Sequence, residues 1–303
     1  MQYFPLFVDT SKLKVLVVGA GDVASRKIDL LARSQVSILV IAPDVSNEIR
    51  QYHRQGRIEL IEREVLEADI NDVDLVYLAT ANNALNCQLS IIAAQRKIWA
   101  NVVDNPEYCQ FITPSIVDRG KLTIAISTSG AAPVFARTIR AKLEAMLPRS
   151  LAPLFDFVAT KRQQVQQALP EGKSRRLFWE RFFKLNQERF DEQTPYHFDA
   201  AFNDLSAAGE LLLVNIDAPA DLLPMAAMPL LQRIDTVCCD SAIPSGLNEL
   251  FRRDAERSEL LLKSDISARL ASGERLLIIA DVQVIKELVA HFPEAKHIRP
   301  GLI

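Results

Sequence analysis

The chain has 303 residues, a length that predicts two or three domains. Hydrophobic residues make up 49% and charged residues 24% of it, as in ordinary globular proteins. No apolar stretch approaches the roughly 20 residues of a membrane span, so we expect no membrane contact. The first residues lack the features of a signal peptide, and the four cysteines show no disulfide framework. A cytoplasmic location is therefore expected.

The net charge of −3 is unevenly distributed. Residues 137–189 contain 12 Lys or Arg against 5 Asp or Glu. Such a basic segment suits an anionic partner, although a solvated helical face would have the same composition. No nucleic-acid-binding module is recognisable, and the four histidines lack the spacing of metal ligands. We therefore expect neither a nucleic-acid partner nor a protein-bound metal.

The first hundred residues alternate apolar runs with helical patterns. Strands are expected at 14–18, 36–42, 58–61, 74–79 and 98–103, and helices at 22–33, 45–54 and 83–96. This alternation predicts an α/β fold with a Rossmann-type parallel sheet over residues 1–113.

A glycine motif lies between the first strand and the first helix. Gly19 would allow a tight turn, Gly21 would let the backbone approach a pyrophosphate, and Ala24 would let the helix pack closely. The free N–H groups of the helix, which begins at Asp22 and Val23, suit phosphate binding. The motif predicts a dinucleotide site, and the alternative is a purely structural turn.

Further cofactor contacts are expected where the second and fourth strands end. The second ends at Pro43-Asp44, and Asp44 lies 23 residues after Gly21, near the spacing of about 20 for a carboxylate that binds ribose. This favours NAD over NADP, although Asp44 could instead cap the next helix. Small residues around Thr80 would let the cofactor cross the sheet edge, or would serve close packing alone.

Asp104 follows the fifth strand, at the sheet edge where ligands bind in this fold. A carboxylate there could act as a general base. The Asp-Asn-Pro sequence is equally typical of a simple turn.

The pattern changes after residue 110. Two β-like runs, 111–117 and 121–127, are joined by a turn at 118–120, and a helix is expected from Pro133 to about Leu147. Several helices follow over 150–207, broken near 170–172 and Pro195.

A polar loop precedes the helix that begins at Pro133. Its residues are Ser127, Thr128, Ser129 and Gly130, and it leads into a helix N-terminus, where anions bind. Arg137 and Arg140 share one face of that helix and could hold carboxylates or phosphates. One hydroxyl could instead be the N-cap.

Alternation resumes after residue 208. Strands are expected at 210–214, 235–239 and 275–279, and helices at 225–232, 244–252 and 282–291. The expected organisation is a sheet domain over 1–113, a hairpin and helix over 114–150, helices over 151–207, and a small α/β domain over 208–303.

Five stretches, taken in order over about residues 1–200, resemble the bifunctional precorrin-2 dehydrogenase/sirohydrochlorin ferrochelatase family, the N-terminal half of siroheme synthase. They are Phe4-Pro-Leu-Phe7, Val17-Val-Gly-Ala-Gly-Asp-Val-Ala-Ser-Arg-Lys27, Asn101-Val-Val-Asp104, Phe111-Ile-Thr-Pro-Ser-Ile116, and Ile126-Ser-Thr-Ser-Gly-Ala-Ala-Pro-Val134 followed by Ala136-Arg137.

The resemblance implies an activity and a set of residues. NAD⁺ would take a hydride from precorrin-2 to give sirohydrochlorin, and Fe²⁺ insertion would then give siroheme. Asp104 would be the shared acid/base residue. NAD would be held by Gly21, Asp22, Val23 and the Pro43-Asp44 segment, and residues 114–150 would form a homodimer interface.

The implied substrate fits the basic charge of the central segment. Precorrin-2 carries eight carboxylates, for which Arg119, Arg137 and Arg140 are the candidate partners. The macrocycle nitrogens would coordinate the iron, so the protein would need no metal ligands of its own.

Residues 209–221 and 250–257 resemble the start of the uroporphyrinogen-III methyltransferase module. Its glycine-rich loop is replaced by Asn215-Ile-Asp-Ala-Pro-Ala-Asp221, whose side chains would keep a cofactor from the backbone. We expect 208–303 to be a truncated, degenerate and structural copy of that module, and the alternative is an unrelated α/β domain.

Two non-enzymatic alternatives stay open. A NAD-responsive regulator would explain the first hundred residues but not Asp104 or the polar loop. A tetrapyrrole-binding protein without catalysis is disfavoured because Asp104 is retained.

Overall fold

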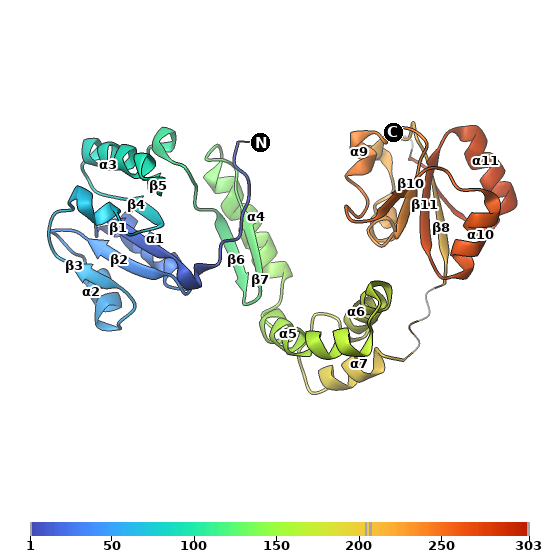
Figure 1. Ribbon diagram of the computed structural model, residues 1–303, viewed down its shortest axis with the longest axis horizontal. Coiled ribbons are helices and arrows are strands. Elements are labelled where there is room, and N and C mark those ends of the chain that lie inside the picture. The colour runs from blue at the N-terminus through green and yellow to red at the C-terminus, as the bar shows by residue number, and fades with distance from the viewer. Residues whose placement is uncertain (1, 204, 206–207, 302–303) are drawn as a thin grey trace. The chain divides into compact units, whose positions relative to one another are not determined.

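The computed structural model describes residues 2–203, 205 and 208–301. The chain forms two units, residues 1–155 and 156–303, and the division falls inside helix α5, Leu151–Ala168 (Figure 1). The expected boundary between 207 and 208 falls on residue 207, which lies outside the described residues. Among the helices of the described residues, none is long and apolar enough to cross a membrane.

The first unit is built on a five-stranded parallel sheet of order β3-β2-β1-β4-β5. Its strands are β1 (Lys14–Val18), β2 (Ser37–Ile41), β3 (Glu59–Ile61), β4 (Leu75–Leu78) and β5 (Trp99–Val102). Its helices are α1 (Asp22–Leu31), α2 (Asn47–Arg54) and α3 (Asn83–Gln95). The predicted Rossmann-type fold is confirmed, with each element within a few residues of its expected bounds.

The aliphatic run of β1 explains why the sheet is covered on both faces. Val15 and Val17 lie in one core with α1 and α2, whereas Leu16 and Val18 lie in the other core with α3. Alternate residues of a strand point to opposite faces. A strand buried on both sides therefore needs apolar residues at every position, which is the pattern that the sequence shows.

A two-stranded hairpin and a helix follow the sheet. Strand β6 (Ser115–Arg119) pairs antiparallel with β7 (Leu122–Ile126), and α4 covers Pro133–Met146. Arg119 pairs with Leu122, so the loop is Gly120-Lys121 rather than the expected 118–120. Gly120 has a φ of +69°, a conformation that glycine adopts without strain. The earlier run expected from 111 is a strand only from Ser115.

The helical part of the second unit contains α5, α6 (Gly172–Asn186) and α7 (Thr194–Ala200). Its core is aromatic: Phe178, Phe182 and Phe198 are fully buried. The ring of Phe198 contacts Phe157, Phe178 and Phe182 edge-on, and Phe157 stacks on Phe182. The expected break near Pro195 is confirmed, because α6 ends at Asn186 and α7 begins only at Thr194. Pro195 lies in the first turn of α7, where its missing N–H has no intrahelical partner to lose.

The rest of the second unit is a second parallel sheet, of order β10-β9-β11-β8-β12. Its strands are β8 (Glu210–Asn215), β9 (Thr236–Cys238), β10 (Glu256–Ser258), β11 (Arg275–Ala280) and β12 (Lys296–Ile298), and its helices are α8 (Met228–Leu231), α9 (Ser245–Asn248), α10 (Lys263–Ala271) and α11 (Val282–His291). Short 3₁₀ turns lie at Thr10–Lys12, Glu67–Ile70, Pro106–Tyr108, Ala220–Leu222 and Met225–Ala227. The small α/β domain is confirmed, but β10, β12 and α10 were not predicted.

Candidate dinucleotide and substrate site

The turn after β1 requires glycine at position 19. Gly19 has a φ of +106°, and its N–H donates to the carbonyl of Ile41 at 3.0 Å. A Cβ at this position would lie 2.5 Å from the carbonyl oxygen of Ala79, closer than real contacts allow. Both the dihedral and the contact exclude a side chain, so Gly19 fixes how closely β1 and β4 approach at this edge.

Gly21 differs from Gly19, because the space above it is open. It is the N-cap of α1 with an ordinary φ of −88°, and a Cβ added to it would meet no atom within 4 Å. Asp22 and Val23 follow as exposed first-turn residues, whereas Ala24 is fully buried under the helix. The first N–H groups of the helix therefore face open space, where a phosphate can accept from them.

The loop after β2 leaves Asp44 exposed. The N-cap of α2 is Ser46, whose Oγ accepts from the N–H of Ile49 at 3.4 Å. The N–H of Ser46 also donates to the carbonyl of Ala20 at 3.1 Å, which ties this loop to the glycine turn. The alternative that Asp44 caps the helix is therefore wrong. Pro43 and Asp44 are both exposed at the carboxyl end of β2.

Thr80 is fixed by a residue that the sequence did not single out. Its hydroxyl lies 2.6 Å from Oδ1 of Asn86, and the amide of Asn86 donates to the carbonyl of Thr80 at 3.0 Å. Asn86 is 2% exposed and lies on α3. Asn86 thus binds the hydroxyl, the N–H and the carbonyl of Thr80, which fixes residue 80 beside the glycine turn.

Asp104 lies at the same edge of the sheet as the glycine turn. Val18 of β1 is in register with Leu78 of β4, which is in register with Val102 of β5. The three strands thus end level with one another. Strands β1 and β5 are two strand spacings apart, roughly 10 Å.

The loop that carries Asp104 is held in an unusual conformation. Asp104 has a φ of +58°, which is uncommon for a residue with a side chain. Cys109 accepts at its Sγ from the N–H of Val102 at 3.1 Å, and the amide of Asn105 donates to the side chain of Asn83 at the start of α3. Asp104 itself is exposed. The loop therefore presents a free carboxylate on a fixed backbone.

A polar cluster lies on the α1 side of β4 and β5. Nζ of Lys27 lies 3.4 Å from Oγ1 of Thr113 and 5.6 Å from the ring centroid of Tyr77, whose hydroxyl is 3.2 Å from the same oxygen. Burial lowers the pKa of Lys27 and raises the pKa of Tyr77, because both ionised forms lose hydration. The cluster ties the segment after β5 to α1.

The polar loop before α4 is a turn closed by its own hydroxyls. The Oγ of Ser127 accepts from the N–H of Ser129 at 3.0 Å, and Oγ1 of Thr128 accepts from the N–H of Ala132 at 3.1 Å. Ser129 and Gly130 both have positive φ. The N-cap of α4 is Ala132, so the alternative that a hydroxyl residue is the N-cap is wrong.

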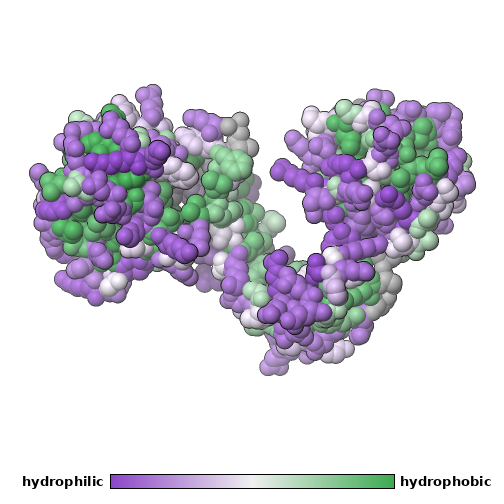
Figure 2. All heavy atoms as spheres, viewed as in Figure 1, coloured by the Kyte–Doolittle hydropathy of each residue, from purple (hydrophilic) through white to green (hydrophobic). Residues whose placement is uncertain are grey.

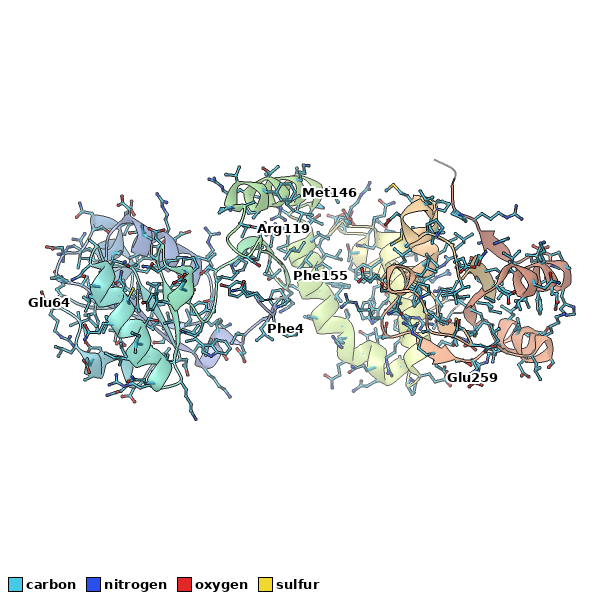
Figure 3. The ribbon with its side chains drawn as sticks, turned by 90° about the horizontal axis from the view of Figure 1, so that it is seen from above. Phe4, Glu64, Arg119, Met146, Phe155 and Glu259 are labelled. Atoms are coloured by element: carbon cyan, nitrogen blue, oxygen red, sulfur yellow. The ribbon has the colours of Figure 1, made fainter. Side chains whose placement is uncertain are left out.

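Arg119 was expected to contact the substrate, but its guanidinium forms bonds within the protein. It is 8% exposed, and its guanidinium donates to the carbonyls of Leu147, Glu144 and Asp118 at 2.8–3.1 Å. It also pairs with the carboxylate of Glu144 at 2.7 Å. Figure 3 labels the position of Arg119. These bonds satisfy the carbonyls at the end of α4 and leave Arg119 little capacity for a ligand.

Arg137 and Arg140 are exposed on α4 and line a hollow of about 730 Å³. Neither Asp104 nor the loop from Ser127 to Gly130 lines it. Within the first unit, the arginines and the polar loop therefore do not line one common hollow.

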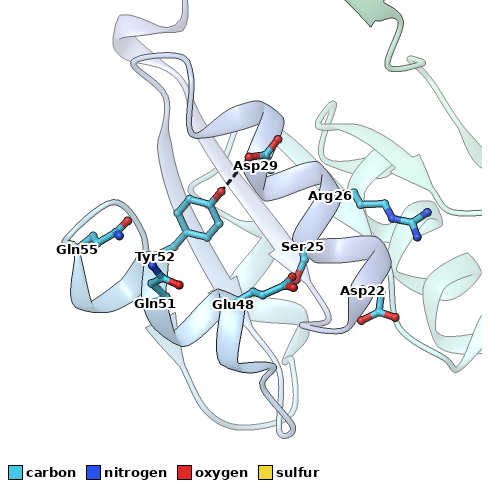
Figure 4. Close-up of a pocket in the computed structure, with 8 residues that line it drawn as sticks. All are labelled: Asp22, Ser25, Arg26, Asp29, Glu48, Gln51, Tyr52 and Gln55. Carbon is cyan, nitrogen blue, oxygen red and sulfur yellow. Dashed lines mark hydrogen bonds between the residues drawn. The ribbon is translucent and has the colours of Figure 1, made fainter. Parts of the chain in front are cut away.

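Another hollow of about 730 Å³ lies between α1 and α2 (Figure 4). Its lining includes the carboxylates of Asp22, Asp29 and Glu48 but only one guanidinium, that of Arg26. The Tyr52 hydroxyl donates to Asp29 at 3.0 Å, and burial raises the pKa of Tyr52. This excess of negative charge is unfavourable for the phosphates of a dinucleotide, for which the glycine turn is the better candidate.

The loop after β8 in the C-terminal sheet differs from the open glycine turn after β1. Ala218 is buried and Ile216 packs against the same core, so the replaced loop fills the space with its own side chains. At the next carboxyl end, Oδ1 of Asp281 accepts from the N–H groups of Gln283 and Val284 at 2.8 and 2.9 Å. The side chains at these two positions do not fit S-adenosylmethionine, and the expectation that this domain does not bind it stays a prediction.

Comparison with known proteins places these features in a family. Residues 6–115 match the family model "Putative NAD(P)-binding", residues 119–146 match "Sirohaem biosynthesis protein central", and residues 150–189 match "Sirohaem synthase dimerisation region". Residues 6–189 therefore belong to the siroheme synthase family. The predicted family is confirmed, and the glycine turn, Asp44 and Asp104 all lie in its NAD(P)-binding domain.

Two relatives that are longer than this chain are siroheme synthases. The chain is 40% identical over 265 residues to siroheme synthase 1 of Yersinia enterocolitica and to siroheme synthase of Sodalis glossinidius, an alignment that covers 85% of this chain and 56% of each relative. It thus spans just over half the length of these relatives. An alignment over 85% of the chain must extend beyond residue 189, so part of the C-terminal sheet is shared with siroheme synthases.

A solved structure supports the fold. SirC, precorrin-2 dehydrogenase, matches with a TM-score of 0.56 and 23% identity, over 66% of this chain and 98% of SirC.

Proposed function

We propose that this protein oxidises precorrin-2 to sirohydrochlorin with NAD⁺ and then inserts Fe²⁺ to give siroheme. The observation that carries the proposal is the position of Asp104 at the same sheet edge as an open glycine turn, within residues that match three siroheme synthase domains in succession.

The glycine turn has the features that a dinucleotide needs. The open space over Gly21 and the uncapped start of α1 would receive the pyrophosphate. Asp44 would accept from the ribose hydroxyls and would repel a 2′-phosphate, which favours NAD over NADP. When bound, NAD⁺ supplies the hydride acceptor.

Asp104 would move the protons of both steps. Oxidation of precorrin-2 removes a hydride and a proton, and the carboxylate would accept that proton. Insertion of Fe²⁺ displaces two protons from pyrrole nitrogens, which the same carboxylate could relay to water. The macrocycle nitrogens hold the metal, so the protein contributes position and a base.

We further propose that the protein is a homodimer. Residues 150–189 match the dimerisation model. Large apolar side chains are exposed in the first unit, at Phe4 and Phe7 of the N-terminal segment and at Val134 and Phe135 of α4. Figure 2 shows apolar residues gathered over the part that carries the hairpin and α4. Exposed apolar patches of this kind mark protein contacts.

The test is turnover by the full chain with precorrin-2 and NAD⁺, followed by the absorbance of sirohydrochlorin. We expect Asp104→Asn to lower turnover by about 10²–10⁴-fold, the usual contribution of general acid–base catalysis. Binding of NADH, followed by its fluorescence, should stay within about twofold. Asp72→Asn, a change of the same kind at another exposed aspartate, should leave turnover unchanged.

Two results would count against the proposal. A wild-type protein that binds NADH but yields no sirohydrochlorin would favour a NAD-responsive regulator or a tetrapyrrole-binding protein. A loss of NADH binding in Asp104→Asn would show that Asp104 supports the fold of the site rather than the chemistry.

A further inference from the structure

Asp104 is the third residue of a four-residue turn, Val102 to Asn105, at the end of β5. The N–H of Asn105 donates to the carbonyl of Val102 at 3.4 Å and closes the turn. Turns with a positive φ at the third position usually carry glycine or asparagine there, whereas this turn carries an aspartate at +58°. A residue with a side chain keeps such a φ only where surrounding contacts hold it. The contacts around the turn therefore determine where the carboxylate of Asp104 lies.

One sulfur atom contacts both ends of this turn. Sγ of Cys109 accepts from the N–H of Val102 at 3.1 Å. The same sulfur lies 3.3 Å from the carbonyl oxygens of Val102 and Asn105, and either oxygen can accept the thiol proton. The 3₁₀ turn at Pro106–Tyr108 brings the chain back to this position. The sulfur thus bridges the residues that flank Val103 and Asp104.

The place of β5 at the edge of the sheet explains why a side chain can reach Val102. The N–H of Val103 donates to β4 at 3.0 Å, so the N–H of Val102 points to the open side of the strand. Further along this side, Gln110 bonds to the carbonyl and the N–H of Ala100, both at 2.9 Å. Cys109 and Gln110 therefore take the place of a neighbouring strand.

Packing alone would also account for a cysteine at this position. Cys109 is half-buried and packs against the core between the sheet and α3. A thiol is a small apolar group with a weak donor and a weak acceptor. The two roles predict opposite responses to substitution. Serine keeps a donor and an acceptor but is more polar, whereas alanine keeps the apolar character and loses the hydrogen bonds.

We propose that Cys109 is a positioning residue for proton transfer, because its sulfur holds the turn in the conformation that presents Asp104 to the substrate. The inference rests on the proposed function, in which Asp104 is the acid/base residue. Cys109 acts through the turn and needs no contact with the substrate or with NAD. Without the sulfur, the turn can relax toward a negative φ. The carboxylate then moves, and the step that needs Asp104 slows.

The test compares Cys109→Ala and Cys109→Ser in the full chain, with turnover of precorrin-2 and binding of NADH as readouts. We expect Cys109→Ala to lower kcat by about 10–100-fold, because a displacement of about 1 Å of a catalytic group costs up to about 10²-fold. Cys109→Ser should stay within about threefold of the wild type, since its hydroxyl can bond to the same backbone groups. Both variants should bind NADH within about twofold of the wild type, because the effect is confined to the chemical step.

Cys87→Ala is the matched control. Cys87 is also half-buried and lies beside the same loop, but its sulfur contacts only the side chains of Asn83 and Asn105, at 3.8 and 3.9 Å. It makes no bond to the backbone of the turn, so Cys87→Ala should turn over as the wild type does.

Two further measurements show whether the effect passes through the turn and through Asp104. In a background of Asp104→Asn, Cys109→Ala should lower kcat no further, because the group that it positions is already lost. Hydrogen–deuterium exchange followed by mass spectrometry needs no turnover. Cys109→Ala should speed the exchange of amides 102–105, and Cys109→Ser should not.

Three results would overturn the proposal. The first is normal turnover by Cys109→Ala when Asp104→Asn is slow, and the second is unchanged exchange of amides 102–105 in Cys109→Ala. The third is a lower kcat for Cys109→Ser than for Cys109→Ala, which would show that packing is the role of the thiol. Normal turnover by Asp104→Asn would instead refute the acid/base role in the proposed function, so the two failures are distinguishable.

Discussion

The same substitution at the two glycines of the turn should affect two different properties, the stability of the fold and the affinity for the cofactor. In Gly19→Ala, the new Cβ would lie 2.5 Å from the oxygen and 2.8 Å from the carbon of the Ala79 carbonyl, at a φ of +106°. A strained backbone dihedral costs about 1–3 kcal/mol, and overpacking costs a similar amount. We expect a loss of about 3 kcal/mol in the free energy of unfolding, which lowers the Tm of a unit of this size by about 6–12 °C.

Gly21→Ala places its Cβ in open space at an ordinary φ. The stability cost is then only that of a poorer N-cap, up to about 1 kcal/mol. The methyl group would occupy the space proposed for the pyrophosphate, so NADH affinity should fall by at least about tenfold, or about 1.4 kcal/mol.

Calorimetry gives the Tm of both variants, and NADH fluorescence gives the affinity. The reasoning would be refuted if the two substitutions lowered the Tm equally, or if Gly21→Ala bound NADH as tightly as the wild type. The first result would mean that the contact with Ala79 is easily relieved. The second would mean that the cofactor does not lie over the start of α1.

Two further predictions concern the buried Arg119 and the C-terminal sheet. Arg119→Gln should lower the free energy of unfolding by about 3 kcal/mol in a urea titration, because it removes a buried guanidinium, breaks its ion pair with the partly exposed Glu144 and takes donors from the carbonyls of Leu147 and Glu144. Arg137→Gln should stay within about 0.5 kcal/mol. A stable Arg119→Gln variant with weakened tetrapyrrole binding would restore the substrate role. Titration calorimetry of the full chain with S-adenosylmethionine should give no saturable heat, since Ala218 and Asp281 close the two expected contact points; a saturable heat would show that the C-terminal sheet keeps a cofactor site.

Features that depend on local sequence were predicted well. The apolar run of β1 followed by Gly19 and Gly21 predicted a buried strand, a tight turn and a helix, because neighbouring residues alone decide these elements. The position of Asp104 at the sheet edge was also predictable, since the carboxyl ends of parallel strands meet at one edge. Strands β10 and β12 were missed because their sequences, Glu-Arg-Ser and Lys-His-Ile, lack the apolar run by which the equally short β3 and β9 were predicted.

Other features depend on which residues are buried in the core. Asp44 and Ser46 can both cap a helix, and the burial of Ile49 decides that α2 begins after Ser46. This leaves Asp44 exposed for a ligand. No local pattern distinguishes the two residues, because the register of the helix is set by its contact with the sheet.

The sequence by itself determined the sheet, the glycine turn, the edge that carries Asp104 and the basic character of the central segment. Only the tertiary structure decided which arginines can meet a ligand: it buried Arg119 against the end of α4 and brought Arg149 beside Arg137 and Arg140. An arginine has a long, flexible side chain with donors at its tip. Whether those donors satisfy backbone carbonyls or remain free for an anion depends on what packs around them, and residues distant in the sequence determine that packing.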